Sequence, residues 1–258
     1  MKRLSFCLAI SAAAVGYASA CPFCYDPKGL FIGETKVLGN GIVYSWAKVD
    51  EKGNPTGVGI TCTATALEGL PTEKPASGAV GYEIPLRLPE QSKATPFNHV
   101  AFDWNPLGHI PPGIYDVPHF DAHFYLMTPE ERLQITLQGD DLARVKKAPP
   151  ASEMPEGYIM APGGEEKYMG MHWGALSWPE FNGGKFVHSF IYGTYNAKLA
   201  FIEPMFTMEY LKTKPQMVAD IPQPKTYPAG KYYPTKYRIS YDEGRKEYTI
   251  ALEGMVKR

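Results

Sequence analysis

After its first twenty residues, the sequence lacks an apolar run near the roughly 20 residues that a helix needs to span a bilayer. It also lacks a basic tract of more than a few residues, and its formal net charge is −1. We therefore expect neither an integral helical membrane protein nor a protein with a nucleic-acid partner. The chain contains no Gly-x-Ser-x-Gly elbow and no phosphate-binding loop, so two common catalytic signatures are missing as well.

The beginning of the chain has the layout of a secretory signal peptide. Lys2 and Arg3 form a short basic start, residues 4–15 are almost entirely apolar or small, and Ala18-Ser-Ala20 is a small-x-small cleavage signature. We expect residues 1–20 to be removed and the protein to be exported to the periplasm or the outer cell envelope.

Cysteine is scarce, and its number bears on the cleavage point. Cys7 would leave with the signal peptide, so Cys21, Cys24 and Cys62 remain, an odd number in an oxidising compartment. If Cys21 is lipidated, the protein is anchored to a membrane and Cys24 can form a disulfide with Cys62. A plain cut after Ala20 instead leaves Cys21-Pro-Phe-Cys24 at the mature N-terminus, outside the βαβ context of thioredoxin-like redox motifs.

Frequent turn residues predict the fold class. The sequence has 25 glycines and 24 prolines, which interrupt many segments rich in Tyr, Val and Ile. This pattern is typical of a mainly β protein, an antiparallel sandwich or barrel with one or two short helices. We predict strands at 29–38, 42–50, 57–67, 80–87, 97–104, 114–127, 185–195, 198–204, 237–241 and 246–252.

We expect residues 21–258 to form a single β-rich domain in which a Pro-rich segment, 213–235, wraps the surface before a final hairpin. In the run 57–67 apolar residues alternate with polar or small ones, so Cys62 should face the core. Thr128-Pro-Glu-Glu131 has the signature of a capping box, which predicts a helix that ends by about Leu142, and 146–168 is predicted to be irregular.

The densest group of polar residues lies between residues 108 and 125. It contains His109 and the alternating series His119, Asp121 and His123. On a strand, this series would place two imidazoles and a carboxylate on one face and aromatic residues on the other. Imidazole and carboxylate together are suitable ligands for a transition metal. However, His119 and His123 would be about 13 Å apart on a straight strand. Either Asp121 acts with only one of them, or a bulge or bend near Phe120 brings both together. A helix opened by Pro118 would also place them side by side, but the aromatic alternation favours a strand.

Two distant residues could complete such a site. His172 lies beside the aromatic residue Trp173. Glu203 lies within an apolar run, where a carboxylate is costly unless it is paired or bound to a metal. We hypothesise that His119, His123 and His172, with Asp121 or Glu203, bind one divalent transition ion. Zinc is the first choice, copper or iron the alternatives, and His109 would be a further ligand or support one.

The sequence leaves the function of this site open. A metal-dependent enzyme and a non-catalytic envelope protein that binds a small ligand or assembles, for example as a homo-oligomer, are both compatible with it. A periplasmic copper-handling protein is a third reading, because methionine thioethers with imidazole suit copper in an oxidising compartment. The methionines concerned are Met160, Met169, Met171, Met205 and Met208.

Several of these segments together resemble a known family. They are the run 108–127, with its motif Pro118-His-Phe-Asp-x-His-Phe-Tyr125, and the shorter runs 171–173, 190–193 and 201–205. The chain is similar over roughly residues 30–210 to uncharacterised bacterial proteins that include a Thermus protein controlled by the sigma factor E. The resemblance implies a β-rich fold and no particular reaction. The resemblance also implies that six residues form the polar signature of the family: His109, His119, Asp121, His123, His172 and Glu203.

Overall fold

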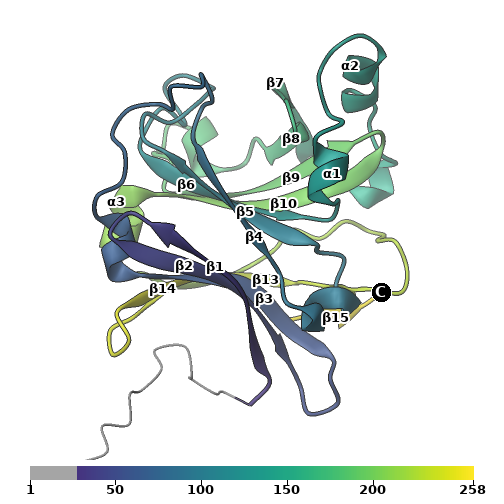
Figure 1. The fold of residues 1–258 in the computed structure, drawn as a ribbon. Helices are drawn as coiled ribbons and strands as arrows, with labels where there is room; N and C mark the ends of the chain where they lie inside the picture. The colour runs from purple at the N-terminus through teal and green to yellow at the C-terminus, as the bar shows by residue number, and fades with distance from the viewer. Residues whose placement is uncertain (1–27) are drawn as a thin grey trace, which may run out of the picture.

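The computed structural model describes residues 28–258, which form two large antiparallel sheets stacked on each other (Figure 1). In spatial order, the six-stranded sheet consists of β1 (Leu30–Leu38), β2 (Gly41–Val49), β3 (Pro55–Thr63), β14 (Glu247–Glu253), β13 (Lys236–Asp242) and β11 (Gln216–Asp220). The seven-stranded sheet consists of β4 (Tyr82–Arg87), β5 (His99–Asn105), β6 (His119–Tyr125), β10 (Lys198–Thr207), β9 (His188–Tyr195), β8 (Gly170–Ala175) and β7 (Tyr158–Glu166).

The remaining elements are short. Strands β12 (Tyr232–Tyr233) and β15 (Val256–Lys257) pair with each other, and the helices are α1 (Pro129–Arg132), α2 (Asp140–Val145) and α3 (Met208–Lys212). Single 3-10 turns lie at Ala64–Leu67, Glu90–Ala94, Ala151–Glu153 and Pro179–Phe181. The described part of the chain is mainly β, sandwich-like and without a closed barrel, which confirms the predicted fold class and selects the sandwich over the barrel.

The hydrophobic core lies between the two sheets. Phe120 and Phe124 of β6 point into it from one side, and Ile60 and Ile250 point into it from the other. Cys62 is fully buried in the same core, as its place in the alternating pattern predicted. Burying a large apolar side chain contributes about 1.5–3 kcal/mol, so this layer holds the two sheets together.

The outer face of the seven-stranded sheet is polar at its centre and is also buried. All seven residues of β5 and all seven of β6 are buried, although the outward-facing positions include His99, Asp103, Asp121 and His123. Figure 1 shows α1, α2 and several loops above this sheet, with β7 and β8 rising at one side. A second apolar cluster, which includes Tyr115 and covers part of this face, keeps water away from it.

Some element boundaries differ from the predictions. The segment predicted as a strand over 114–127 is extended only in β6, since the two prolines and Gly113 before it form turns. The capping box at Thr128 is present and starts the short helix α1, which ends at Arg132, before the predicted limit of about Leu142, and α2 is a separate helix that was not predicted.

The segments predicted to be irregular or to wrap the surface contain strands. Strand β7 lies within 146–168, and β11 lies within 213–235. The Pro-Gly-Gly sequence 162–164 falls where the pairing of β7 with β8 shifts register, and this irregularity explains how a strand tolerates those residues.

No helix of the described region is long and apolar enough to cross a membrane. The predicted signal peptide, Cys21 as the predicted alternative site of lipidation, and the predicted disulfide partner Cys24 lie outside the described residues.

The capping box of α1 gives a first test of the fold. The Thr128 hydroxyl accepts a hydrogen bond from the Glu131 amide at 3.2 Å, and the Glu131 carboxylate accepts one from the Thr128 amide at 2.8 Å. We expect Thr128→Ala to lower the free energy of unfolding by about 1 kcal/mol, because an amide at the helix start loses its partner. Urea denaturation measures this, and Thr128→Ser, which keeps the hydroxyl, should remain close to the unaltered protein. Equal losses in both variants would contradict the capping role.

Candidate metal centre

Strand β6 provides the centre of the polar site. His119, Asp121 and His123 occupy alternate positions and therefore share the outer face of the seven-stranded sheet. The pairing of β6 with β5 continues without a register shift, so the bulge that a single shared ion would require near Phe120 is absent from this strand. The two histidines consequently stay about 13 Å apart at the backbone.

The six predicted residues form two groups instead of one. His109, His119 and Asp121 bring their donor atoms within 4.8 Å of one another, and we call this group the Asp121 cluster. The second group, the Glu203 cluster, brings the donor atoms of His123, His172 and Glu203 within the same distance of one another. Each cluster contains two imidazoles and one carboxylate and could hold a metal ion. The structure thus distributes the predicted ligands over two neighbouring three-residue sets.

The Asp121 cluster joins β6 to the loop that precedes it. His109 Nε2 lies 3.3 Å from Asp121 Oδ2, and His119 Nε2 lies 3.3 Å from Asp121 Oδ1. The side chain of Asn105, across the ladder on β5, donates to Asp121 Oδ2 at 2.7 Å. Gly108 has a φ of +65°, and a Cβ there would lie 2.1 Å from the Tyr115 carbonyl oxygen, so glycine is needed to place His109 over the sheet.

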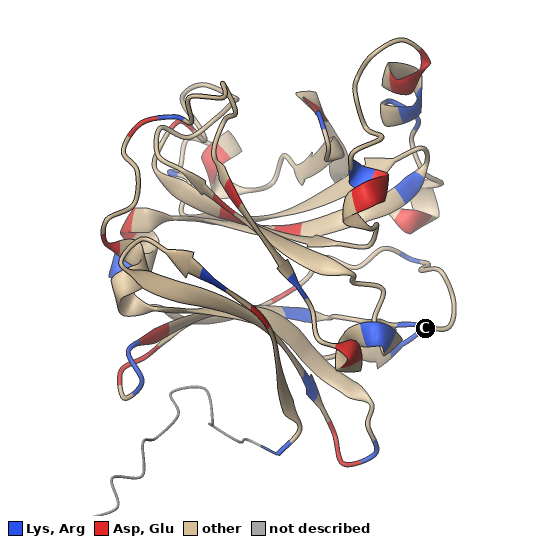
Figure 2. Ribbon diagram, viewed as in Figure 1, with Lys and Arg blue, Asp and Glu red and all other residues tan. Residues whose placement is uncertain are grey.

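The Glu203 cluster joins three strands. His123 Nε2 on β6 lies 3.3 Å from Glu203 Oε2 on β10, and His172 Nε2 on β8 lies 3.9 Å from the same oxygen. His123 also contacts β5, because its Nδ1 lies 2.8 Å from Asp103 Oδ2. Figure 2 shows acidic residues within the strands of the upper, seven-stranded sheet, which carries this cluster.

In each of the four histidines of the two clusters, Nδ1 has a hydrogen-bond partner. This partner orients the ring so that Nε2 faces a carboxylate. The Nδ1 atoms of His109, His119 and His172 lie 2.7–2.8 Å from backbone carbonyl oxygens, which can only accept, so these nitrogens carry protons. In the neutral ring, Nε2 then presents a lone pair. A lone pair that faces a carboxylate oxygen is repulsive unless a proton or a metal ion lies between them.

The distribution of unsatisfied polar atoms agrees with this geometry. Among residues 28–258, six buried side-chain nitrogen or oxygen atoms have no hydrogen-bond partner. Four of the six belong to the two clusters: His119 Nε2, Asp121 Oδ1, His123 Nε2 and Glu203 Oε2. Because buried polar groups are normally satisfied, their concentration at adjacent donor atoms indicates a missing shared partner.

Burial keeps the histidines of the Glu203 cluster neutral. It lowers the pKa of His123 to about 4 and, with a smaller contribution from His123, lowers the pKa of His172 to about 4. Burial and the charges of Asp121 and Asp103 raise the pKa of Glu203 well above its usual range. The imidazoles therefore carry no extra proton at neutral pH, and the proton of this cluster lies on the Glu203 carboxyl group, where it can satisfy only one of the two Nε2 lone pairs.

The Asp121 cluster has a different balance. Burial opposes ionisation of Asp121, but the charges and hydrogen bonds of His119 and His109 outweigh it and hold the pKa of Asp121 well below its usual range. Burial likewise lowers the pKa of His109, and the hydrogen bond and charge of Asp121 reverse this and raise that pKa above its usual value. A proton on His109 can therefore satisfy this cluster in part.

An aromatic side chain, Phe201, packs against both histidines of the Glu203 cluster. The ring of Phe201 lies 4.9 Å from that of His123 and 5.0 Å from that of His172, measured between centroids. Phe201 is fully buried, and it can lie there because the neighbouring residue on β9 is Gly193. A Cβ at Gly193 would lie 2.0 Å from the Phe201 ring.

One histidine in each cluster reaches the surface. The side chains of His109 and His172 are 24% and 22% exposed, whereas the side chains of the other four donors are at most 5% exposed. An ion or small molecule would therefore approach past these two histidines.

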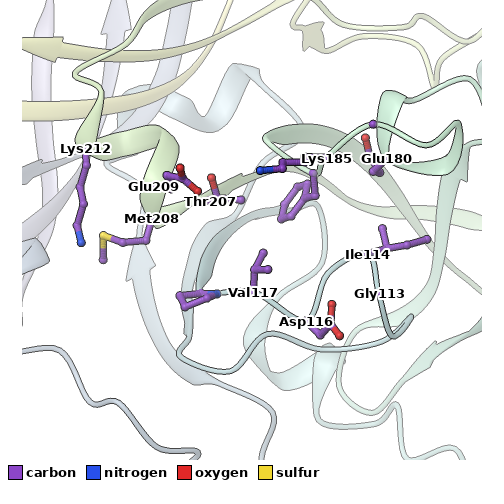
Figure 3. A pocket seen from close by; sticks show the side chains of 13 residues that line it. Gly113, Ile114, Asp116, Val117, Glu180, Lys185, Thr207, Met208, Glu209 and Lys212 are labelled. Atoms are coloured by element: carbon purple, nitrogen blue, oxygen red, sulfur yellow. The ribbon is translucent and has the colours of Figure 1, made fainter.

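A cavity of about 560 Å³ lies next to the Asp121 cluster and opens beside α3 (Figure 3). Val117 and Phe186 line it and also touch the cluster, since the Val117 carbonyl accepts from His119 and the Phe186 ring lies 5.4 Å from the His119 ring. This cavity could not be predicted from the sequence, because its lining comes from three separate segments.

The two other histidines of the chain and the methionines considered above have structural surroundings. His99 packs on Tyr125, and His188 lies 3.2 Å from the Tyr237 hydroxyl. The five methionines considered for copper all pack in or against the apolar clusters.

Two polar residues that contact the donors were not predicted: Asp103 and Asn105. They alternate with Phe102 and Trp104 in an apolar strand, and this pattern was a usable signal in the sequence.

Comparison with known protein families finds a family model that matches part of the chain. Residues 50–104 match the model of a family described as TTHB210-like, hypothetical protein TTHB210, which confirms the predicted resemblance to the Thermus family. The matched segment runs from β3 into β5 and contains Asp103, but it contains none of the six donors. No curated protein and no solved structure matches the chain.

The contact between Gly193 and Phe201 gives a second test. We expect Gly193→Ala to lower the free energy of unfolding by about 1–3 kcal/mol, because the added methyl group would displace a rigid, fully buried ring. Gly174→Ala on β8 is the matched control, since a Cβ there would make an ordinary 3.5 Å contact with Ile191. Urea denaturation compares the two variants, and similar stabilities would show that Phe201 is not held as closely as the structure indicates.

Proposed function

We propose that this chain is an exported, metal-dependent enzyme whose primary ion is a divalent transition metal bound by His123, His172 and Glu203. The observation that supports this most strongly is the meeting of unpartnered His123 Nε2 and Glu203 Oε2 atoms inside the protein. Both imidazoles are held neutral by burial, so each offers an Nε2 lone pair, and a cation can bind the two rings and the carboxylate together in place of the proton on Glu203.

The donor set fits zinc first and iron second. Two histidines and one glutamate are the protein ligands of a common class of catalytic zinc site, and two histidines with one carboxylate also hold non-haem iron. Three protein donors leave coordination positions for a substrate, which favours a catalytic over a purely structural ion. A zinc ion held there would act as a Lewis acid on a substrate oxygen.

Neighbouring residues of the chain would orient these ligands. The Asp103 carboxyl group contacts His123 Nδ1, and the Gly164 carbonyl contacts His172 Nδ1, so both rings are fixed with Nε2 toward Glu203. Phe201 packs against both imidazoles and excludes water from this side of the site.

The Asp121 cluster would bind a second ion with lower affinity. Asp121 and His123 are two residues apart on one face of β6, so the two clusters are about 7 Å apart at the backbone. A proton on His109 competes with a metal ion here, which is the physical reason for the lower affinity.

One observation supports copper at the second cluster. Met205 lies directly opposite Asp121 in the pairing of β10 with β6, and it therefore shares the outer face with that cluster. A thioether next to two imidazoles is a suitable copper environment. A periplasmic copper-handling role is accordingly the second function to test.

The metal hypothesis predicts two bound ions per chain. In protein purified without a histidine tag and incubated with zinc, elemental analysis should find two equivalents in the unaltered chain and one in His172→Ala and in His119→Ala. His188→Ala is the matched control for His172→Ala and should keep both ions. Ligand at about 100 times its Kd stabilises a protein by about 2.7 kcal/mol, so zinc should also raise the melting temperature.

Two outcomes would contradict this assignment. If the unaltered protein holds no stoichiometric zinc, copper, iron or manganese and none of them raises its melting temperature, the site does not bind metal. If bound metal survives both cluster substitutions, the ion lies elsewhere. Preferential retention of copper by the Asp121 cluster would favour the copper-handling function.

Export gives a separate prediction. After expression with its own leader, the mature chain should begin at Cys21, and its intact mass should show either a lipid on Cys21 or a free N-terminus. A mature chain that retains Met1 in the cytoplasm would contradict export. A lipid-free chain beginning at Cys21 would retain export and exclude the membrane anchor.

A further inference from the structure

Beside the Glu203 cluster lies another buried polar atom without a partner, the hydroxyl of Tyr125. It is one of the two atoms among the six unsatisfied ones that do not belong to the proposed metal ligands. Tyr125 is fully buried, and another fully buried tyrosine of this sheet, Tyr192, donates its hydroxyl to the Pro222 carbonyl at 2.7 Å. A tyrosine without such a partner is unusual inside a protein.

The position of Tyr125 connects it to the cluster. It follows His123 by two residues on β6, and the two rings are nearly parallel, with an interplanar angle of 11° and a centroid distance of 5.5 Å. Across the sheet, Tyr125 pairs with Phe201, which pairs with Gly193, which pairs with His172. Tyr125 and His172 thus lie at the two ends of one row, with the Phe201 ring between them.

Neighbouring groups fix the Tyr125 ring firmly. His99 stacks on it with a centroid distance of 4.9 Å, and the Arg132 guanidinium carbon lies 3.9 Å from its centroid. Arg132 is itself held by two hydrogen bonds to Glu83, at 3.1 and 2.6 Å. The phenol is therefore positioned in advance, and its hydroxyl, at the end of a longer side chain, extends beyond the neighbouring imidazole.

A rigidly held donor next to a cation is an arrangement that recognises an oxygen ligand. A bound oxyanion can accept a hydrogen bond from the phenol while another of its oxygens contacts the ion, and charged acceptors form the stronger hydrogen bonds. The positive charge of Arg132 over the ring also polarises the O–H bond, which makes the phenol a stronger hydrogen-bond donor. Burial would also strengthen both interactions, since the local dielectric is low.

We propose that Tyr125 donates a hydrogen bond to a small oxyanion, such as the carboxylate of a substrate, that enters the Glu203 cluster and binds its ion. This rests on the proposed metal site and adds the class of ligand to it. The ligand would approach past the exposed edge of His172. Tyr125 would then determine specificity, because a ligand without an acceptor oxygen leaves the phenol unsatisfied.

Acetate binding to the cobalt(II)-loaded protein tests this inference. Cobalt(II) replaces zinc and reports changes at the ion in its visible spectrum, so acetate affinity can be measured without knowing the reaction. We expect Tyr125→Phe to weaken acetate binding by about tenfold or more, as loss of a hydrogen bond to a charged group does. The phenylalanine ring keeps the packing on His123, and cobalt should remain bound.

Tyr158→Phe is the matched control. Tyr158 is also buried, but its hydroxyl donates to the Phe190 carbonyl at 2.7 Å, and it packs in the core between the sheets. We expect this variant to bind acetate normally and to melt at a lower temperature, because it leaves a buried carbonyl unpaired. Without metal, Tyr125→Phe should melt at the same temperature as the unaltered protein or higher, since it removes an unsatisfied hydroxyl.

The outcomes separate the two proposals. Equal acetate affinity in cobalt-loaded Tyr125→Phe and the unaltered protein would overturn the role of Tyr125 and leave the metal site standing. A lower melting temperature of metal-free Tyr125→Phe, equal to that of Tyr158→Phe, would overturn it too, because the hydroxyl would then have a structural partner. Failure of the unaltered protein to bind cobalt would overturn both proposals.

Discussion

Strand β6 is buried on both faces, and the rest of the site depends on what each face can accommodate. One face consists of Phe120, Ala122 and Phe124 and joins the core between the sheets. The other carries two imidazoles and a carboxylate into a region that water reaches poorly. Charge and polarity in such a place are stable only when every donor and acceptor has a partner, so the surrounding residues are constrained to provide partners.

The neighbouring strands meet this constraint in part. Asp103 and Asn105 on β5 contact His123 and Asp121 diagonally across the ladder, and backbone carbonyls accept hydrogen bonds from Nδ1 of the other histidines. What these partners leave unsatisfied is Nε2 of His119 and His123 and one oxygen of each cluster carboxylate. The sheet therefore directs the unsatisfied atoms toward shared points instead of distributing them over the face.

The sequence was sufficient to predict a mainly β sandwich or barrel, the inward Cys62 and the capping box, and to single out six polar residues, because each depends on local spacing or on the chemistry of one residue. It was insufficient for their grouping. Whether His123 meets His119 or Glu203 depends on strand order, and β10 and β8 are brought to β6 only by pairings far apart in sequence. Strand β7 was missed because a Pro-Gly-Gly sequence normally indicates a loop, while here a register shift accommodates it.

The two clusters have the same composition but differ in how their repulsion can be relieved. His109 is partly exposed and hydrogen-bonds to Asp121, so a proton can occupy the position between ring and carboxylate. In the Glu203 cluster, burial disfavours that proton on both imidazoles, and it raises the pKa of the Glu203 carboxyl group, which therefore keeps the proton. A single proton on Glu203 can satisfy one imidazole Nε2, whereas a divalent cation can bind both imidazoles together with the carboxylate. The deeper cluster therefore has the stronger requirement for a metal ion, and the Tyr125 hydroxyl stands beside that cluster.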